Sequence, residues 1–344
     1  MAHIQPLLKT SRRQLLRLRA VTASIWSLTG PITSTGAWAQ TGPAVKAPEL
    51  LRLGYQKSAV NLVILKQQGV LEKRFPQTKV AWYEFPAGPQ LLEALAVGSL
   101  DFGLTGDSPP VFAQAAGKDL VYAGAEPSKP ESSAILVPKD SPIRTLADLK
   151  GRKIALQKGS SAHYLLVQAV DKAGLQWSDI QPIYLAPADA RAAFERKSVD
   201  AWVIWDPFYA ATELAIQPRV LTTGKGLSGN NSFYLASRTF ATQHPDTVGA
   251  LFEELTRADQ FVQAHRADAI KLISDFSGLD AGVVSLFLQR RPPSPVGLLK
   301  PGMVVDQQRV ANAFARLALI PKTVQVADIV WQPKPGLSAQ VSSQ

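Results

Sequence analysis

The segment LDFGLTGDSPP, residues 100–110, predicts a short buried strand ending at Thr105, then a glycine-containing loop and a helix that starts at Pro109. Proline suits the first position of a helix because the amide hydrogen it lacks would have no acceptor inside the helix. The segment VDAWVIWDP, residues 199–207, repeats this order, with a strand followed by a helix that starts at Pro207. The repeated order predicts two structurally similar lobes.

Strands and helices alternate ahead of each of these segments. The predicted strands and helices are, in chain order, Leu50–Tyr55, Asn61–Gln68, Lys79–Glu84 and Gln90–Val97 in the first run, and Ala134–Pro138, Lys153–Gln157, Ala162–Ala173, Ile180–Leu185 and Pro187–Glu195 in the second. Such alternation is typical of βαβ units and predicts mostly parallel sheets. From Pro245 onward the pattern is mostly helical, so the expected fold class is α/β with a helical C-terminal region.

Composition excludes several classes of protein. The chain has 344 residues and no cysteine, which excludes disulfides, a cysteine nucleophile and thiolate metal sites. The formal net charge is +10, but the basic residues are scattered, and Arg290-Arg291 is the only pair of adjacent arginines after the N-terminal region. A nucleic-acid-binding face would gather its basic residues with aromatic residues, so no nucleic-acid partner is expected. A mildly basic surface suits the capture of small anions.

The N-terminus has the features of an export signal. Ser11–Arg17 contains a twin-arginine pair, a moderately apolar stretch follows, and Ala37-Trp38-Ala39 reads as a cleavage site. We interpret residues 1–39 as a twin-arginine-type signal peptide, which predicts a mature periplasmic protein beginning near Gln40. Residues 40–48 and 332–344 are interpreted as a flexible lead-in and a flexible tail.

Candidate binding groups follow the predicted strands. In open parallel sheets, ligands bind beyond the carboxyl ends of the strands. Four loops qualify, and they contain Gln56–Ser58, Gly106–Ser108, Gly159–Ser161 and Asp206. Each precedes a helix, and a helix N-terminus with its free amide groups attracts anions.

Structural roles compete with ligand binding at these positions. Ser161, Asp107 and Asp206 are each residue types that cap helices. Trp202 and Trp205 lie on one apolar strand, where core packing is the default, and Trp205 at the strand end is the better candidate for a cleft.

The sequence contains little that indicates catalysis. His163 lies near Ser160-Ser161, so a Ser–His pair is conceivable, but the chain has no G-x-S-x-G motif. The chain also has no H-E-x-x-H zinc motif, no P-loop and no G-x-G-x-x-G motif, so neither a metal nor a cofactor is expected.

Several longer motifs resemble those of one family. They are LGYQK (residues 53–57), EFPAGPQLLEAL (84–95), TGDSPP (105–110), QKGSSAH (157–163), PADARAAF (187–194), IWDP (204–207) and RRPP (290–293). Together they resemble the aliphatic sulfonate-binding proteins of the nitrate, sulfonate and taurine ABC importers, and the resemblance runs from about Leu50 to Trp331.

The resemblance implies a type II periplasmic-binding-protein fold, in which two α/β lobes are joined by a hinge that the chain crosses twice. We expect the crossings near Val137 and Ser237. The first lobe then comprises residues 49–137 and 238–331, and the second lobe comprises residues 138–237.

The resemblance also implies ligand contacts in the cleft. The expected contact residues are Gln56, Lys57, Gly106, Asp107, Ser160, Ser161, Trp205, Asp206 and Phe233. The expected function is noncovalent capture of an alkanesulfonate by a monomer that delivers it to the permease and ATPase subunits of an importer. Taurine, nitrate, bicarbonate, an aromatic sulfonate or a sulfate ester are alternative ligands, and an enzyme resembling thiamine-pyrimidine synthases is an alternative class.

Overall fold

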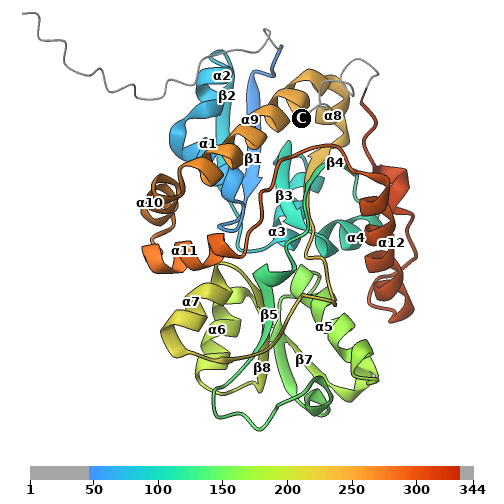
Figure 1. Cartoon of the computed structure of the whole chain (residues 1–344). Coiled ribbons are helices and arrows are strands. Elements are labelled where there is room, and N and C mark those ends of the chain that lie inside the picture. Colours follow the sequence, from blue (N-terminus) through green and yellow to red (C-terminus); the bar gives the residue numbers. More distant parts are fainter. Residues whose placement is uncertain (1–45, 334–344) are drawn as a thin grey trace, which may run out of the picture. The chain divides into compact units, whose positions relative to one another are not determined.

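Two five-stranded sheets organise the protein, whose computed structural model describes residues 46–333 (Figure 1). The signal peptide, most of the lead-in and most of the tail expected from the sequence lie outside the described residues. The strands of the first sheet are, in spatial order, β2 (Lys79–Glu84), β1 (Leu50–Tyr55), β3 (Phe102–Gly106), β10 (Ser232–Ser237) and β4 (Leu120–Glu126). Those of the second sheet are β7 (Gln181–Tyr184), β6 (Lys153–Leu156), β8 (Ala201–Trp205), β5 (Ser133–Val137) and β9 (Arg219–Thr223).

The two sheets have equivalent topologies. In each sheet one central strand pairs in parallel with two others, β1 with β2 and β3, and β6 with β7 and β8. The fourth strand of each sheet, β10 or β5, is antiparallel to both of its neighbours. The sheets are mixed, but four strands of each sheet run in one direction and one runs against them, which agrees with the mostly parallel sheets that the sequence pattern predicted. The repeated strand order agrees with two lobes of similar design.

The crossing points differ from those expected near Val137 and Ser237. The chain leaves the first sheet after β4 and enters the second at β5, so it crosses between Glu126 and Ser133. It returns between Thr223 and Ser232, because β10 already belongs to the first sheet. The shift arises because Val137 and Ser237 end the antiparallel strands that follow each crossing.

Helices cover both faces of each sheet and define, with it, a first and a second lobe (Figure 1). The helices around the first sheet are α1 (Val60–Gln68), α2 (Val70–Arg74), α3 (Gly88–Ala96), α4 (Ser108–Ala115), α8 (Arg238–Gln243), α9 (Pro245–Ala264), α10 (Arg266–Ser277), α11 (Ala281–Gln289) and α12 (Pro301–Arg316). Those of the second lobe are α5 (Ser161–Lys172), α6 (Pro187–Glu195) and α7 (Phe208–Ile216). Short 3₁₀ helices lie at Pro130–Ser132, Leu146–Leu149, Trp177–Asp179 and Val326–Ile329. The helical C-terminal region expected from the sequence is confirmed.

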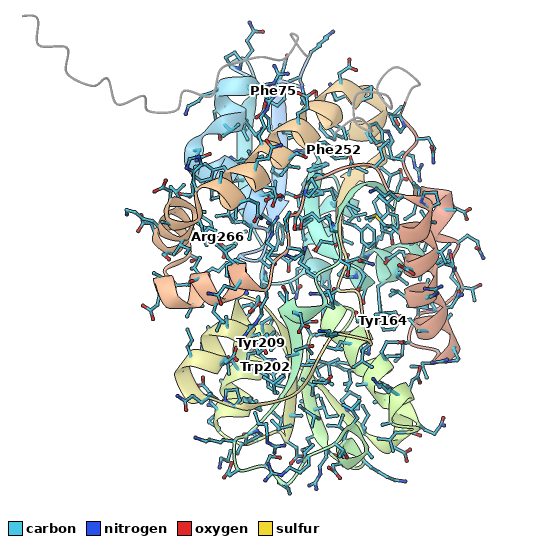
Figure 2. All side chains as sticks on the ribbon, viewed as in Figure 1. Phe75, Tyr164, Trp202, Tyr209, Phe252 and Arg266 are labelled. Atoms are coloured by element: carbon cyan, nitrogen blue, oxygen red, sulfur yellow. The ribbon has the colours of Figure 1, made fainter. Side chains whose placement is uncertain are left out.

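Each sheet is covered by apolar side chains on both faces. One face of the first sheet packs against α1, α9 and α11 through residues such as Tyr234 and Phe252, and the other packs against α3, α4 and α12 through Phe233 and Phe314. In the second lobe, Trp202 packs on the α6 face. Figure 2 labels Phe252 in the first lobe and Trp202 in the second. In the described part of the chain, no helix has the length and apolar character needed to cross a membrane.

The lobes touch through two groups of helices. α4 and α12 of the first lobe contact α5, and α11 contacts α7. In Figure 1, α11 lies along the edge of the first lobe that faces α7. The crossing segments and the two helix contacts therefore join the lobes at separate places.

The close approach of β1 and β3 gives a prediction about stability. A Cβ atom added at Gly103 would lie 2.8 Å from the carbonyl oxygen of Gly54, which is backbone and cannot easily move. We expect Gly103→Ala to lower the free energy of unfolding by about 1–3 kcal/mol, as overpacked cores do. Urea denaturation measures the effect. The matched control is Gly302→Ala, in α12 with no atom within 4 Å of the added Cβ, which should leave stability equal or slightly higher.

Candidate functional site: a cavity between the two lobes

A cavity opens where the carboxyl ends of the parallel strands of both sheets face each other. Its empty volume is about 640 Å³, including the part that is open to solvent. The residues around it are Gln56, Ser58, Gly88, Leu104, Thr105, Gly106, Pro109, Lys129, Ser132, Ser160, Ser161, Trp205, Asp206, Asn230, Ser232, Phe287 and Arg291.

The structure brings six of the nine expected contact residues to this cavity. They are Gln56, Gly106, Ser160, Ser161, Trp205 and Asp206. These residues end or follow β1, β3, β6 and β8, so their meeting is a direct result of parallel strands ending at one edge. Whether any of them contacts a ligand remains a prediction.

Three expected residues lie elsewhere. Phe233 is fully buried and packs edge-on against Tyr122, because its neighbour Ser232 takes the position at the cavity and side chains alternate along a strand. Lys57 directs its ammonium group to the carbonyl oxygen of Ser277, 3.1 Å away. Asp107 is buried beside the cavity rather than on its wall.

Helix N-termini supply amide groups at the cavity. Gly88 and Ser161 begin α3 and α5, and the first amides of a helix have no acceptor within it. One amide expected to be available is used: the N–H of Asp107 donates to the Ser161 hydroxyl oxygen at 3.2 Å, across the two lobes. A hydroxyl that accepts in this way still has its own proton to donate. Any Cβ at position 106 would lie 1.9 Å from that hydroxyl oxygen, so this close approach requires glycine.

The two aspartates have different structural roles. Asp206 accepts from the N–H of Ala210 at 3.0 Å, so it stabilises the start of α7 as a capping residue would. Asp107 accepts from the Ser108 hydroxyl at 2.9 Å and makes no capping bond to an amide of α4. Burial raises the pKa of Asp206 to about 7, against the opposing charge of Arg290, and raises the pKa of Asp107 to about 6.

Two buried cations, Lys129 and Arg291, were not among the expected contact residues. The Lys129 ammonium lies 2.8 Å from Glu126, and the Arg291 guanidinium lies 2.6 Å from Asp259 and 3.8 Å from Glu126. Both cationic residues line the cavity, whereas neither Glu126 nor Asp259 does.

Two neutral side chains complete this ionic network. Arg291 also donates to the Asn61 side-chain oxygen at 2.9 Å, and Tyr234 donates to Glu126 at 2.9 Å. Burial alone would raise the pKa of Glu126, but the charges of Lys129 and Arg291 outweigh it and hold the pKa below its ordinary value. The Arg290-Arg291 doublet was a sequence signal for Arg291, whereas Lys129 stands in no recognisable motif.

The crossing segments form part of the cavity wall. The N–H of Lys129 donates to the carbonyl oxygen of Gly229 at 3.0 Å, and the Asn230 side chain donates back to the carbonyl oxygen of Lys129 at 3.2 Å. Lys129, Ser132 and Asn230 all line the cavity. A molecule in the cavity would therefore touch the segments that connect the two lobes.

His163 is part of the core rather than of a catalytic pair. It is fully buried, its Nδ1 accepts from the N–H of Gly159 at 3.2 Å, and aromatic rings including Phe112 and Phe314 surround it. Burial lowers its pKa to about 3, so the imidazole is neutral. It holds the loop that precedes Ser160 in place.

The fold and cavity define a class of protein. Two α/β lobes, joined by two crossings and enclosing a cavity at the strand ends, are the architecture of the periplasmic solute-binding proteins.

Comparison with known proteins identifies the family within this class. The NMT1/THI5-like family model matches residues 79–269. The chain is 49% identical over 290 residues to an Escherichia coli (strain K12) protein named for binding aliphatic sulfonates, covering 84% of this chain and 91% of the relative.

Solved structures give the same result. The alkanesulfonate-binding protein SsuA from Xanthomonas axonopodis pv. citri, bound to MOPS, is 50% identical with a TM-score of 0.80, covering 83% of this chain and 98% of that one. The periplasmic aliphatic sulphonate binding protein SsuA from E. coli is 49% identical with a TM-score of 0.78, covering 84% and 94%. The chain belongs to this family of aliphatic sulfonate-binding proteins, which are binding proteins of ABC importers and not enzymes.

The buried state of His163 predicts how stability depends on pH. An unfolded chain binds a proton at this histidine below pH 6.5, whereas the folded protein does so only near pH 3. Its contribution to stability is complete above pH 6.5 and is lost as the pH falls, at about 1.4 kcal/mol per pH unit. We expect the free energy of unfolding of wild type to fall between pH 8 and pH 5 by about 2 kcal/mol more than that of His163→Gln.

Urea denaturation at the two pH values tests this difference. The aspartates with raised pKa values are present in both proteins, so their effects cancel. The control is His265→Gln, which changes an exposed histidine and should show the wild-type pH dependence. Equal pH dependence in wild type and His163→Gln would contradict the prediction.

Proposed function

We propose that this protein is the periplasmic substrate-binding component of an ABC importer, and that it captures aliphatic sulfonates in the cavity between its lobes. It delivers them as a monomer to permease and ATPase subunits in the inner membrane. The proposed signal peptide, cleaved near Ala39, places the mature protein in the periplasm. Family membership supports the class of function, and the cavity supports the class of ligand.

The arrangement of donors in the cavity is the observation that carries the proposal. A sulfonate spreads one negative charge over three oxygens, each of which accepts hydrogen bonds, so it suits a site with several convergent donors. The Ser161 hydroxyl and the N-terminal amides of α5 provide such donors from one lobe. From the opposite side, the two buried cations Lys129 and Arg291 line the cavity and add positive potential.

The apolar part of the ligand has its own surface. Trp205 and Phe287 are the aromatic residues at the cavity, one from each lobe. Contact with an aromatic face depends little on alkyl length, so this surface accommodates a range of alkanesulfonates. Phe233, one of the contact residues expected from the sequence, is buried away from the cavity, and Phe287 takes its place.

Calorimetry with methanesulfonate, ethanesulfonate and longer alkanesulfonates tests the ligand class. We expect binding near micromolar affinity, which corresponds to about −8 kcal/mol. Taurine, nitrate and sulfate esters serve as competitors. Tight binding of nitrate or taurine without binding of simple alkanesulfonates would overturn the proposed ligand.

Lys129 allows a paired test of whether a buried cation at the cavity contributes to ligand binding. Lys129→Gln removes a buried charge at the cavity, and we expect alkanesulfonate affinity to fall about tenfold or more. The matched control is Lys225→Gln, which removes a largely exposed lysine near the second crossing that pairs with Glu131 at 3.5 Å. Calorimetry should show an unchanged affinity for the control. Thermal denaturation checks that both variants are folded. Equal affinities of the two folded variants would show that Lys129 does not contribute to ligand binding.

A further inference from the structure

Arg290 reaches from one lobe to the other. It follows the last residue of α11, a helix whose Val284, Phe287 and Leu288 pack in the core of the first lobe. Its guanidinium donates to Asp206 at 3.1 Å and also contacts the Glu213 carboxylate.

Arg290 also contacts an aromatic ring of the second lobe. The guanidinium carbon of Arg290 lies 3.7 Å from the centre of the Tyr209 ring, which is within cation–π distance. Figure 2 labels Tyr209 on the second lobe, close to α11. Asp206 ends β8, and Tyr209 and Glu213 lie on α7, so all three partners of this guanidinium belong to the second lobe.

The contact is directly connected to the cavity. Asp206 lines the cavity, as do Phe287 and Arg291, which lie on either side of Arg290 in the chain. The neighbouring arginines therefore diverge: Arg291 binds carboxylates inside the first lobe, and Arg290 binds carboxylates of the second.

Parting of the lobes would separate Arg290 from Asp206. The Asp206 side chain is only 3% exposed, and a buried carboxylate that loses its cation is strongly disfavoured. The fraction of Asp206 that stays ionised would also present a negative charge to the cavity and repel an anionic ligand. Binding of an anion and formation of the Arg290–Asp206 pair therefore favour each other.

We propose that Arg290 is a positioning residue that holds the lobes closed on the α7–α11 side and draws the Asp206 carboxylate away from an anionic ligand. Only the effect of Asp206 on an anionic ligand rests on the proposed anion-binding function. The closure of the lobes by Arg290 concerns contacts that are present without any ligand.

A second ion pair between the lobes provides a matched control. Arg316 of α12 contacts Asp171 of α5, but the two side chains are 60% and 39% exposed. Exposed pairs contribute little, because water and salt screen them. Arg316→Gln therefore removes an arginine that joins the lobes while leaving the cavity unchanged.

The experiment compares wild type with Arg290→Gln, Arg290→Lys and Arg316→Gln. Small-angle X-ray scattering of the ligand-free proteins measures closure, and calorimetry with ethanesulfonate measures affinity. For Arg290→Gln we expect a larger radius of gyration and an affinity about tenfold or more below wild type, as for other couplings between a conformational change and binding. Arg290→Lys keeps the positive charge but lacks the planar guanidinium group. Its radius of gyration and affinity should lie between those of wild type and Arg290→Gln. Arg316→Gln should match wild type in both measurements.

A double variant separates the two roles of Arg290. Asp206→Asn combined with Arg290→Gln removes the repelling charge, so affinity should recover in part while the radius stays enlarged. Should Arg290→Gln fail to fold, Glu213→Gln weakens the same contact at its more exposed partner and should enlarge the radius to a smaller extent. Equal radii and affinities for Arg290→Gln and Arg316→Gln would overturn the proposal. If wild type binds no alkanesulfonate, the proposed function fails, and the scattering comparison still decides closure.

Discussion

The buried ionic network around Arg291 is the interaction on which the cavity depends. Arg291 joins Asp259 of α9, Asn61 of α1 and Glu126 at the end of β4, and Lys129 adds a second cation to Glu126. Four charged groups taken out of water are tolerated only because each has a partner, and breaking such a set by removing one member costs about 3–5 kcal/mol. Stability of the first lobe and positive potential in the cavity therefore come from the same residues.

The mixed sheets explain why the cavity and the hinge coincide. Each crossing segment connects an outer strand of one sheet to the antiparallel strand of the other, and both segments pass the carboxyl ends of the parallel strands. Lys129 and Asn230 lie on these segments and on the cavity wall at once. Binding and lobe movement are thus physically linked, without a separate element to connect them.

Local signals allowed the strand-end loops to be predicted, because glycine, serine and proline at Gly106–Pro109 and Ser160–Ser161 mark turns wherever they occur. Strand β4 was not predicted: Leu120–Glu126 is buried at every position and lacks the alternation that reveals a half-exposed strand. Lys129 could not be predicted either, because its role depends on Arg291 and Glu126, which only the folded chain brings together. Phe233 was assigned to the wrong side because the register of β10 is set by its partners β3 and β4.

The strand order also has a consequence for the order of folding. All five strands of the second sheet lie in one continuous segment, Ser133–Thr223, so that lobe can complete its sheet as soon as the segment has been synthesised. The first sheet must wait for β10, which fits between β3 and β4 and comes last in the chain. Until then those two strands present unpaired edges, which are the usual starting points of aggregation. A nascent chain halted shortly before Ser232 would hold one finished lobe and one open sheet, the state in which a chaperone would be needed most.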